Sequence, residues 1–194
     1  DKIGTKWETF ANFWRTTQLE YTWLRSLMKR HKNFWDITED SLDKSMKVFN
    51  INKNMKNELL SLYKILSPYP EVRGVLEDLK KKNFKLSILS NGTPDLLNEL
   101  VENNKLNNLF DDLFSIEEVK IYKPDPSVYE LPVKKYKIKS GEITFLSANT
   151  WDVSGGGNFG YNSIWVNRHN TVFDILDFQP KNEINNLTHL LDKV

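Results

Sequence analysis

The spacing of the hydrophobic residues changes about a third of the way along the chain. Up to Leu66 they recur every three or four residues, which is the period of a helix packed on one side. Helices are therefore predicted over 5–30, 38–50 and 54–66. The prolines of Ser67–Pro70 end this pattern. Beyond them, helical periods alternate with short apolar runs that are typical of buried strands, which predicts a parallel α/β sheet.

The second part of the chain is predicted in more detail. The expected elements are helices over 71–82 and 94–103, a helix that begins at Pro126, strands over 84–89, 114–119, 143–147 and 163–166, and a closing helix over 187–191. The segment Asn149–Gly160 is predicted as a loop or a turn of helix, with its glycines in a flexible turn. We therefore expect a helical subdomain over residues 1–70 and a doubly wound parallel α/β core over residues 71–194.

Polar residues follow three of the predicted strands. They are Ser90 and Asn91 after the first strand, Lys123 after the second, and Ser147, Asn149 and Asp152 after the third. In an open parallel sheet, ligands bind outside the carboxyl ends of the strands. These side chains are therefore predicted to line one crevice.

The long first helix adds a further candidate. Arg15 and Leu19 lie four residues apart, so they point in the same direction from the helix. An arginine at such a position most often pairs with a surface carboxylate, and helical spacing alone favours that interpretation.

Composition excludes several classes of function. The chain of 194 residues carries a net charge of +1 and no cysteine, so neither a nucleic-acid surface nor a disulfide framework is indicated. No apolar run is long enough for a membrane span, and a cytoplasmic protein is expected. His31, His169 and His189 lack the spacing of metal ligands and are predicted at the surface. The G-x-G-x-x-G run at Gly155–Gly160 lies too far from the preceding strand for a dinucleotide site.

Four stretches together resemble a known family. They are Leu89-Ser-Asn-Gly-Thr-Pro, Val119-Lys-Ile-Tyr-Lys-Pro-Asp-Pro-Ser-Val-Tyr-Glu, Ser147-Ala-Asn-Thr-Trp-Asp-Val-Ser-Gly, and the helical segment from Trp14 to Met28. They are similar to the haloacid dehalogenase superfamily, and within it to the L-2-haloacid dehalogenases (type II). The Ser-x-Asn-x-x-Asp block is specific, because phosphatases of the superfamily carry acidic magnesium ligands there.

The resemblance implies a substrate and roles for the residues. The substrate is a small 2-haloalkanoic acid, which an aspartate attacks to release halide and form an ester that water hydrolyses with inversion. No cofactor or metal is implied, and a homodimer through the long helix is expected. The resemblance assigns catalysis to Arg15, Ser90, Lys123, Ser147, Asn149 and Asp152, and substrate binding to Leu19, Phe34, Asn91, Tyr129 and Trp151. Thr16 departs from the family, where glutamine is common, which leaves the substrate range open.

The family's first strand carries Asp-x-Tyr-Gly-Thr before the long helix. Neither Asp1 nor Gly4-Thr5 matches it, so we expect a partial sequence that lacks the nucleophile and is inactive by itself. Two other functions remain open at this point. One is a small-molecule phosphatase of the same fold, against which Ser147 and Asn149 argue. The other is a non-catalytic interaction protein built on the aromatic helix.

Overall fold

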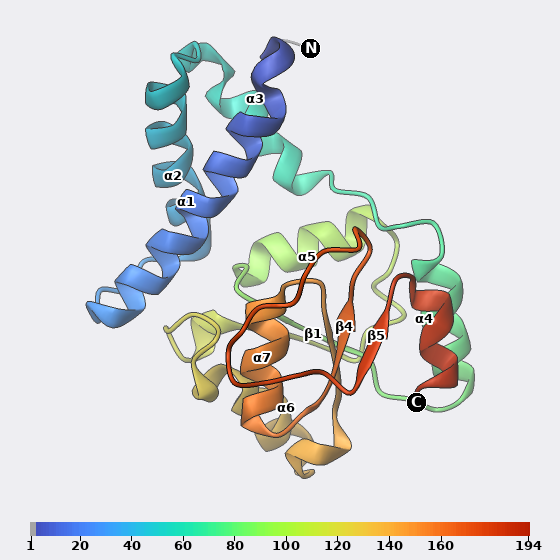
Figure 1. Ribbon diagram of the computed structural model, residues 1–194. Coiled ribbons are helices and arrows are strands. Elements are labelled where there is room, and N and C mark those ends of the chain that lie inside the picture. The colour runs from blue at the N-terminus through green and yellow to red at the C-terminus, as the bar shows by residue number, and fades with distance from the viewer. Residues whose placement is uncertain (1–2) are drawn as a thin grey trace.

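The computed structural model describes residues 3–194. Three helices come first: α1 (Trp7–Leu27), α2 (Phe34–Phe49) and the short α3 (Lys56–Ser61). Figure 1 shows them standing together above the part of the molecule that contains the strands, joined to it by an extended connection. The helices agree with the predicted ones in number and order along this stretch.

The remaining elements alternate as the sequence predicts. They are α4 (Val72–Lys81), β1 (Ser87–Ser90), α5 (Pro94–Asn103), β2 (Asp112–Ser115), α6 (Pro126–Tyr136), β3 (Thr144–Ser147), α7 (Thr150–Phe159), β4 (Asn162–Val166), β5 (Asn182–Ile184) and a closing 3₁₀ segment (Leu187–Asp192). Thr93 and Asp125 cap α5 and α6, and a proline stands at the start of each helix, as predicted.

The strands form two parallel groups. β1 pairs with β2, and β4 lies between β3 and β5. This confirms the parallel α/β class, although β5 was not predicted because its three residues lie in a polar stretch. Across residues 3–194, no ladder joins β1 to β3.

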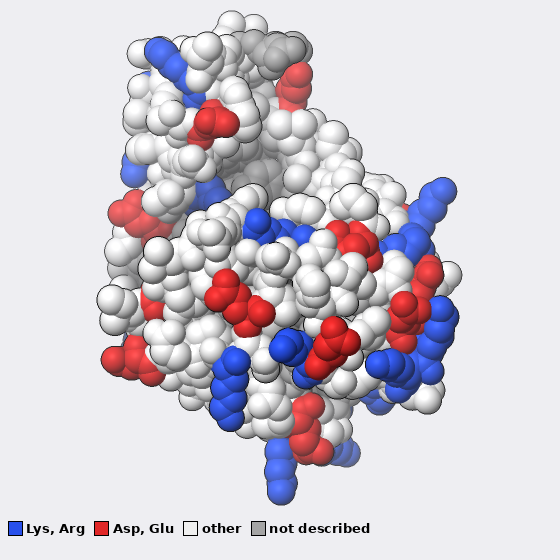
Figure 2. All heavy atoms as spheres, turned by 45° about the vertical axis from the view of Figure 1, so that its right-hand side comes forward, with Lys and Arg blue, Asp and Glu red and all other residues white. Residues whose placement is uncertain are grey.

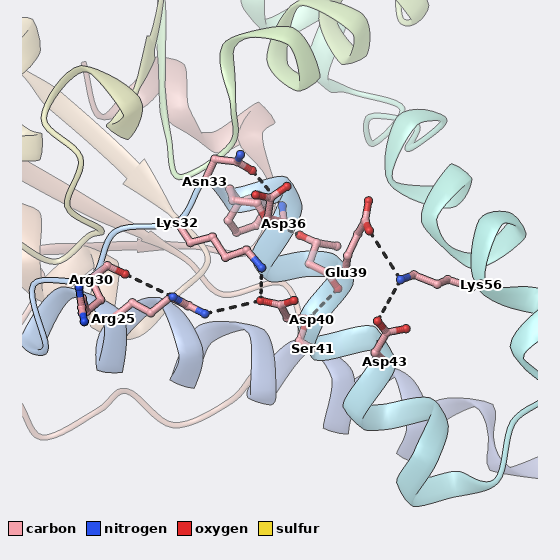
Figure 3. Close-up of polar contacts among 12 residues, drawn as sticks. Arg25, Arg30, Lys32, Asn33, Asp36, Glu39, Asp40, Ser41, Asp43 and Lys56 are labelled. Carbon is pink, nitrogen blue, oxygen red and sulfur yellow. Dashed lines mark hydrogen bonds and ion pairs between the residues drawn. The ribbon is translucent and has the colours of Figure 1, made fainter.

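The first three helices enclose a core of their own. Phe10 and Trp14 of α1 pack against Leu42 and Met46 of α2. Ion pairs tie the exposed side of these helices together, as Figure 3 shows. Lys32 and Arg25 both reach the Asp40 carboxylate, at 2.6 and 3.6 Å, while Lys56, the first residue of α3, lies 3.0 Å from Asp43.

Two helix predictions need correction. Helix α2 begins four residues before Thr38, because Asn33 is the cap and its Oδ1 accepts the Asp36 N–H at 2.9 Å. The segment 149–160 is a full helix, α7, and not a loop. Its glycines lie inside the helix, where neighbouring side chains pack so closely that a larger residue would clash. A Cβ on Gly155 would lie 2.5 Å from the Tyr129 hydroxyl oxygen. The glycines thus allow close packing, and only Gly160 ends the helix with a positive φ of 110°.

Two strand predictions were too long. β1 starts at Ser87, because the Phe84 N–H still bonds to Leu79 at the end of α4. β2 ends at Ser115, whose Oγ accepts the Glu117 N–H and starts a 3₁₀ turn. Asp111 directly precedes β2, where its carboxylate accepts the Leu86 N–H and pairs with Lys80.

The described surface carries charges of both signs. Figure 2 shows lysines and arginines interspersed with aspartates and glutamates over the face in view. This agrees with the near-zero net charge, and the face in view offers a polyanion no surface of a single sign. Among residues 3–194, no helix is long and apolar enough to span a membrane.

Candidate active site

Lys123 lies at the centre of the polar strand ends. The loop between β2 and α6 delivers it, and its side chain is 6% exposed. The ammonium donates to the Leu89 carbonyl of β1 at 2.8 Å and to Asp152 Oδ2 at 3.2 Å. Lys123 therefore joins the end of β1 to the start of α7, which follows β3.

Three side chains hold the Asp152 carboxylate. Oδ2 accepts from Lys123 and from the Ser147 hydroxyl at 2.9 Å, and Oδ1 accepts from the Tyr129 hydroxyl at 2.8 Å. Asp152 is 5% exposed. Because both oxygens are engaged, this carboxylate is fixed in place and orients the lysine.

Burial sets the electrostatics of this group. It lowers the pKa of the Lys123 ammonium below the ordinary lysine value, and the Asp152 carboxylate only partly opposes this. Burial also raises the pKa of Tyr129, helped by Asp152, so that the phenol stays a donor. The Lys123 ammonium lies 5.0 Å from the centre of the Phe145 ring, an apolar neighbour that limits its access to water.

Arg15 meets the core at Asn149. Its Nη2 donates to Asn149 Oδ1 at 2.6 Å, although the two residues are 134 positions apart. The surface ion-pair interpretation is therefore wrong: the partner is an amide at the N-cap of α7, and not a carboxylate. Both side chains remain partly exposed, so the remaining guanidinium donors face a region that solutes reach.

The turn after β1 completes the polar group. Ser90 Oγ accepts the Gly92 N–H at 3.0 Å, and Asn91 Oδ1 accepts the Lys123 backbone N–H at 3.2 Å. The turn leads directly into α5 through the Thr93 cap. Ser90 and Asn91 thus lie at the amino end of a helix, where the dipole favours an anion.

The residues predicted for the apolar wall lie in three elements. Leu19 is half-buried one turn of α1 beyond Arg15, and Phe34 begins α2. Trp151, the second residue of α7, meets Trp23 of α1 edge to face, with ring centroids 5.5 Å apart. Tyr129 differs from its predicted role, because its side chain is fully buried and bonds to Asp152. It lies behind the polar group and not on an exposed wall.

Histidines and metal ligands need one correction. His169 and His189 are exposed, as predicted, but His31 is half-buried. Its Nε2 lies 3.0 Å from Glu117 Oε2, and its ring stacks near Tyr122. The described part of the chain holds no group of three or more His, Cys, Asp or Glu arranged as metal ligands.

Comparison with known proteins identifies the family of the chain. A family model described as haloacid dehalogenase-like hydrolase matches residues 8–166. The chain belongs to this family. Among its haloacid dehalogenase relatives, (S)-2-haloacid dehalogenase 4A of Burkholderia cepacia is 35% identical over 193 residues, which span 98% of this chain and 83% of that protein.

Solved haloacid dehalogenases share the fold. A structure described as a dehalogenase superposes with a TM-score of 0.95 at 33% identity, covering 98% of this chain and 85% of the other. L-2-haloacid dehalogenase from Xanthobacter autotrophicus, with chloropropionic acid covalently bound, gives 0.89 at 28% identity, covering 96% and 86%.

Sequence patterns did not indicate all the contacts of the polar group. Trp23 donates its indole N–H to the Lys123 carbonyl at 3.2 Å, but in the sequence it is one aromatic residue of an aromatic helix. The Leu89 carbonyl is a backbone group, which no residue pattern marks. Phe145 carried a signal, since it directly precedes the Leu-Ser-Ala-Asn run.

Proposed function

We propose that the protein hydrolyses (S)-2-haloacids to (R)-2-hydroxyacids and halide through an aspartyl ester. The observation that carries the proposal is the buried Lys123–Asp152 pair beside the Arg15–Asn149 contact. It combines a cation that stabilises an attacking carboxylate with an exposed guanidinium that suits a substrate carboxylate or a departing halide. Family membership and the haloacid dehalogenase relatives support the same chemistry.

Asp152 is a poor candidate for the attacking group. Three donors occupy its oxygens, and turning one toward a substrate would break a bond to Lys123, Ser147 or Tyr129. In our proposal Asp152 fixes Lys123, and the attack comes from a second carboxylate beside the ammonium. That carboxylate also offsets the burial that lowers the pKa of Lys123.

The strand layout supports a place for this second carboxylate. Lys123 bonds to the Leu89 carbonyl of β1, while Ser147 at the end of β3 bonds to the same Asp152 that Lys123 reaches. Lys123 thus contacts the end of β1 directly and the end of β3 through Asp152. No described strand pairs with β1 on the side away from β2, or with β3 on the side away from β4. We propose that an Asp-x-Tyr-Gly-Thr strand fits between them and places its aspartate next to Lys123.

The reaction follows from these positions. An aspartate oxygen attacks C2 of the haloacid from the side opposite the halogen, the carbon–halogen bond breaks, and halide leaves with the bonding electrons. Water then attacks the ester carbonyl, and the bond between that carbon and the hydroxyacid oxygen breaks. One proton of the water goes to the hydroxyl group of the product and the other is released to solvent. The carboxylate is regenerated and the hydroxyacid leaves with inverted configuration. Asp152 and Lys123 orient the groups, while Arg15 and Asn149 hold the substrate carboxylate or the departing halide.

Binding involves both parts of the molecule. We propose that residues 1–70 act as a cap on the core of residues 71–194. Leu19 and Phe34 of the cap and Trp151 of the core then flank the alkyl group of the substrate. Ser90 and the Asn91 amide, at the start of α5, receive an anionic group.

We also propose a homodimer through α1. Large apolar side chains are exposed along this helix: Trp7 is 57% exposed, Leu27 79% and Met28 61%. Light scattering should give the mass of two chains. Leu27→Glu should reduce it to one, whereas Val172→Glu, which changes an exposed residue outside α1, should leave the dimer intact.

The test is product analysis with a chain extended at its N-terminus by the Asp-x-Tyr-Gly-Thr strand. We expect (S)-2-chloropropionate to yield one chloride and one (R)-lactate per turnover, with equal rates in EDTA and in magnesium. Magnesium-dependent release of phosphate from p-nitrophenyl phosphate, without chloride release, would instead establish the phosphatase alternative. A folded extended chain with neither activity would favour the interaction protein.

A further inference from the structure

One turn of α1 contacts the backbone on both sides of the bond between Tyr122 and Lys123. The Ser26 hydroxyl oxygen accepts the Tyr122 N–H at 3.2 Å. The Trp23 indole N–H donates to the Lys123 carbonyl, also at 3.2 Å. Ser26 is itself fixed, since its hydroxyl donates to the Thr22 carbonyl at 3.0 Å. The cap helix therefore grips the segment that delivers the lysine.

The other polar groups of Lys123 bond to the core. Its N–H donates to Asn91 Oδ1, and its ammonium donates to the Leu89 carbonyl and to Asp152. The carbonyl that Trp23 holds is thus the point where the cap bonds directly to this residue. A shift of α1 would displace the lysine backbone and the ammonium with it.

The same indole touches a second residue of the proposed site. The rings of Trp23 and Trp151 meet edge to face, with centroids 5.5 Å apart and an interplanar angle of 83°. Trp151 lies in the first turn of α7, one residue before Asp152. A single cap side chain therefore braces both segments whose residues form the Lys123–Asp152 pair.

From these contacts we propose that Trp23 is a positioning residue, which couples docking of the cap to the placement of Lys123 and Trp151. Trp23 acts through the lysine backbone and the tryptophan ring, and not on the substrate. The inference rests on the proposed dehalogenase function, but it makes a separate claim about how Lys123 is held.

The decisive variant is Trp23→Phe, which keeps an aromatic ring near Trp151 and removes the N–H donor. The matched control is Trp35→Phe, the same change in a cap residue that packs against the core of α1 and α2. In the strand-extended chain we expect Trp23→Phe to lower kcat about 10-fold, since small misplacements of catalytic groups have effects of this order or larger. KM should change less, because Arg15 and Asn149 are untouched.

A pH profile separates positioning from a general loss of stability. If the contact between α1 and the Lys123 segment loosens, water reaches the ammonium. Burial is the main cause that lowers the pKa of Lys123, so this pKa should then rise. Its charged neighbour Asp152 and the Tyr129 phenol stay in place. The alkaline limb of kcat/KM should therefore move to higher pH in Trp23→Phe and stay fixed in Trp35→Phe. A fall in kcat with an unmoved limb, or an unchanged kcat, would overturn the proposal.

A measurement without turnover keeps this claim separate from the proposed function. Lysine side-chain NMR titration of the 194-residue chain reports the Lys123 pKa directly, with its signal assigned by its loss in Lys123→Arg. We expect the pKa to rise in Trp23→Phe and, by less, in Ser26→Ala. If the extended chain releases no halide yet this pKa moves, the dehalogenase proposal fails and the positioning role stands. An unmoved pKa in both variants refutes the positioning role.

Discussion

β4 and the pair β1 and β3 are built from similar residues but are buried to different extents. β4 has a paired neighbour on each side, and four of its five residues are buried. β1 and β3 each pair on one side within residues 3–194, and all their residues are half-buried or exposed. In these three strands, burial thus follows the number of neighbouring strands more than the apolar character of the sequence.

The difference supports the position proposed for the active site. The ends of β1 and β3 carry Ser90 and Ser147, and Lys123 bridges the two sides through the Leu89 carbonyl and Asp152. β4, which is paired on both sides, is followed by Asn167, whose amide donates to the Thr171 carbonyl and to the Glu183 carboxylate. The polar groups that remain available for chemistry therefore lie beside the unpaired edges.

Loss of Lys123, which connects the ends of β1 and β3, should have the largest effect on activity. In the strand-extended chain, Lys123→Ala should lower kcat/KM for (S)-2-chloropropionate about 1,000-fold, because the attacking carboxylate loses its cation. Chloride release measures this. Lys134→Ala, which removes an exposed lysine paired with Glu130, is the control and should keep full activity. Near-normal turnover of Lys123→Ala would show that the site lies elsewhere.

The pairing of β4 on both sides and of β3 on one side should also affect the free energy of unfolding. Ile164 of β4 and Leu146 of β3 belong to one apolar cluster, but Ile164 is 2% exposed and Leu146 is half-buried. Ile164→Ala should cost about 2–5 kcal/mol of unfolding free energy. Leu146→Ala should cost less than half of that in the 194-residue chain, and more once the extra strand covers it. Urea unfolding checks this, and equal costs in the short chain would contradict the comparison.

A smaller effect concerns Tyr136, which ties β1 to β2. Its hydroxyl donates to Asp112 at 2.7 Å and lies 2.5 Å from Ser87 Oγ. Burial raises the pKa of Tyr136 to about 12. Because this folded-state pKa exceeds the ordinary value near 10, the stability that Tyr136 contributes is present below about pH 10 and is lost as pH rises toward 12.

The matched variant is Tyr136→Phe, which should be less stable than the parent by about 1 kcal/mol at pH 9. Urea midpoints at pH 9 and pH 11.5 measure the gap between the two proteins. We expect the gap to narrow at the higher pH. A constant gap would mean that the phenol does not titrate in this window.

Elements with strong local signals could be predicted from the sequence. Pro94 after Thr93 and Pro126 after Asp125 fix the starts of α5 and α6, because a capping side chain and a preset φ both act within a few residues. The prediction of a flexible turn at Gly155–Gly157 was wrong. Glycine is found there because Tyr129, Phe145 and Phe178 crowd this part of the helix. That crowding depends on tertiary packing, which the local sequence does not contain.

The candidate site could likewise be predicted only in part. The polar residues at the strand ends could be found, because parallel strands bring their carboxyl ends to one edge. The structure joins Lys123 to Asp152 and Arg15 to Asn149. The position of Tyr129 behind Asp152 and the hold of Trp23 on a backbone carbonyl could not be found, since both depend on how α6 and α1 dock.

The central proposal is that a strand carrying the nucleophile fits between β1 and β3. The most direct measurement compares three proteins for chloride release and thermal unfolding: the 194-residue chain, the chain extended by an Asp-x-Tyr-Gly-Thr strand, and the same extension with asparagine in place of that aspartate. Both extended proteins should melt well above the short chain, and only the aspartate form should release chloride. Turnover by the short chain, or equal turnover by the asparagine form, would contradict the account.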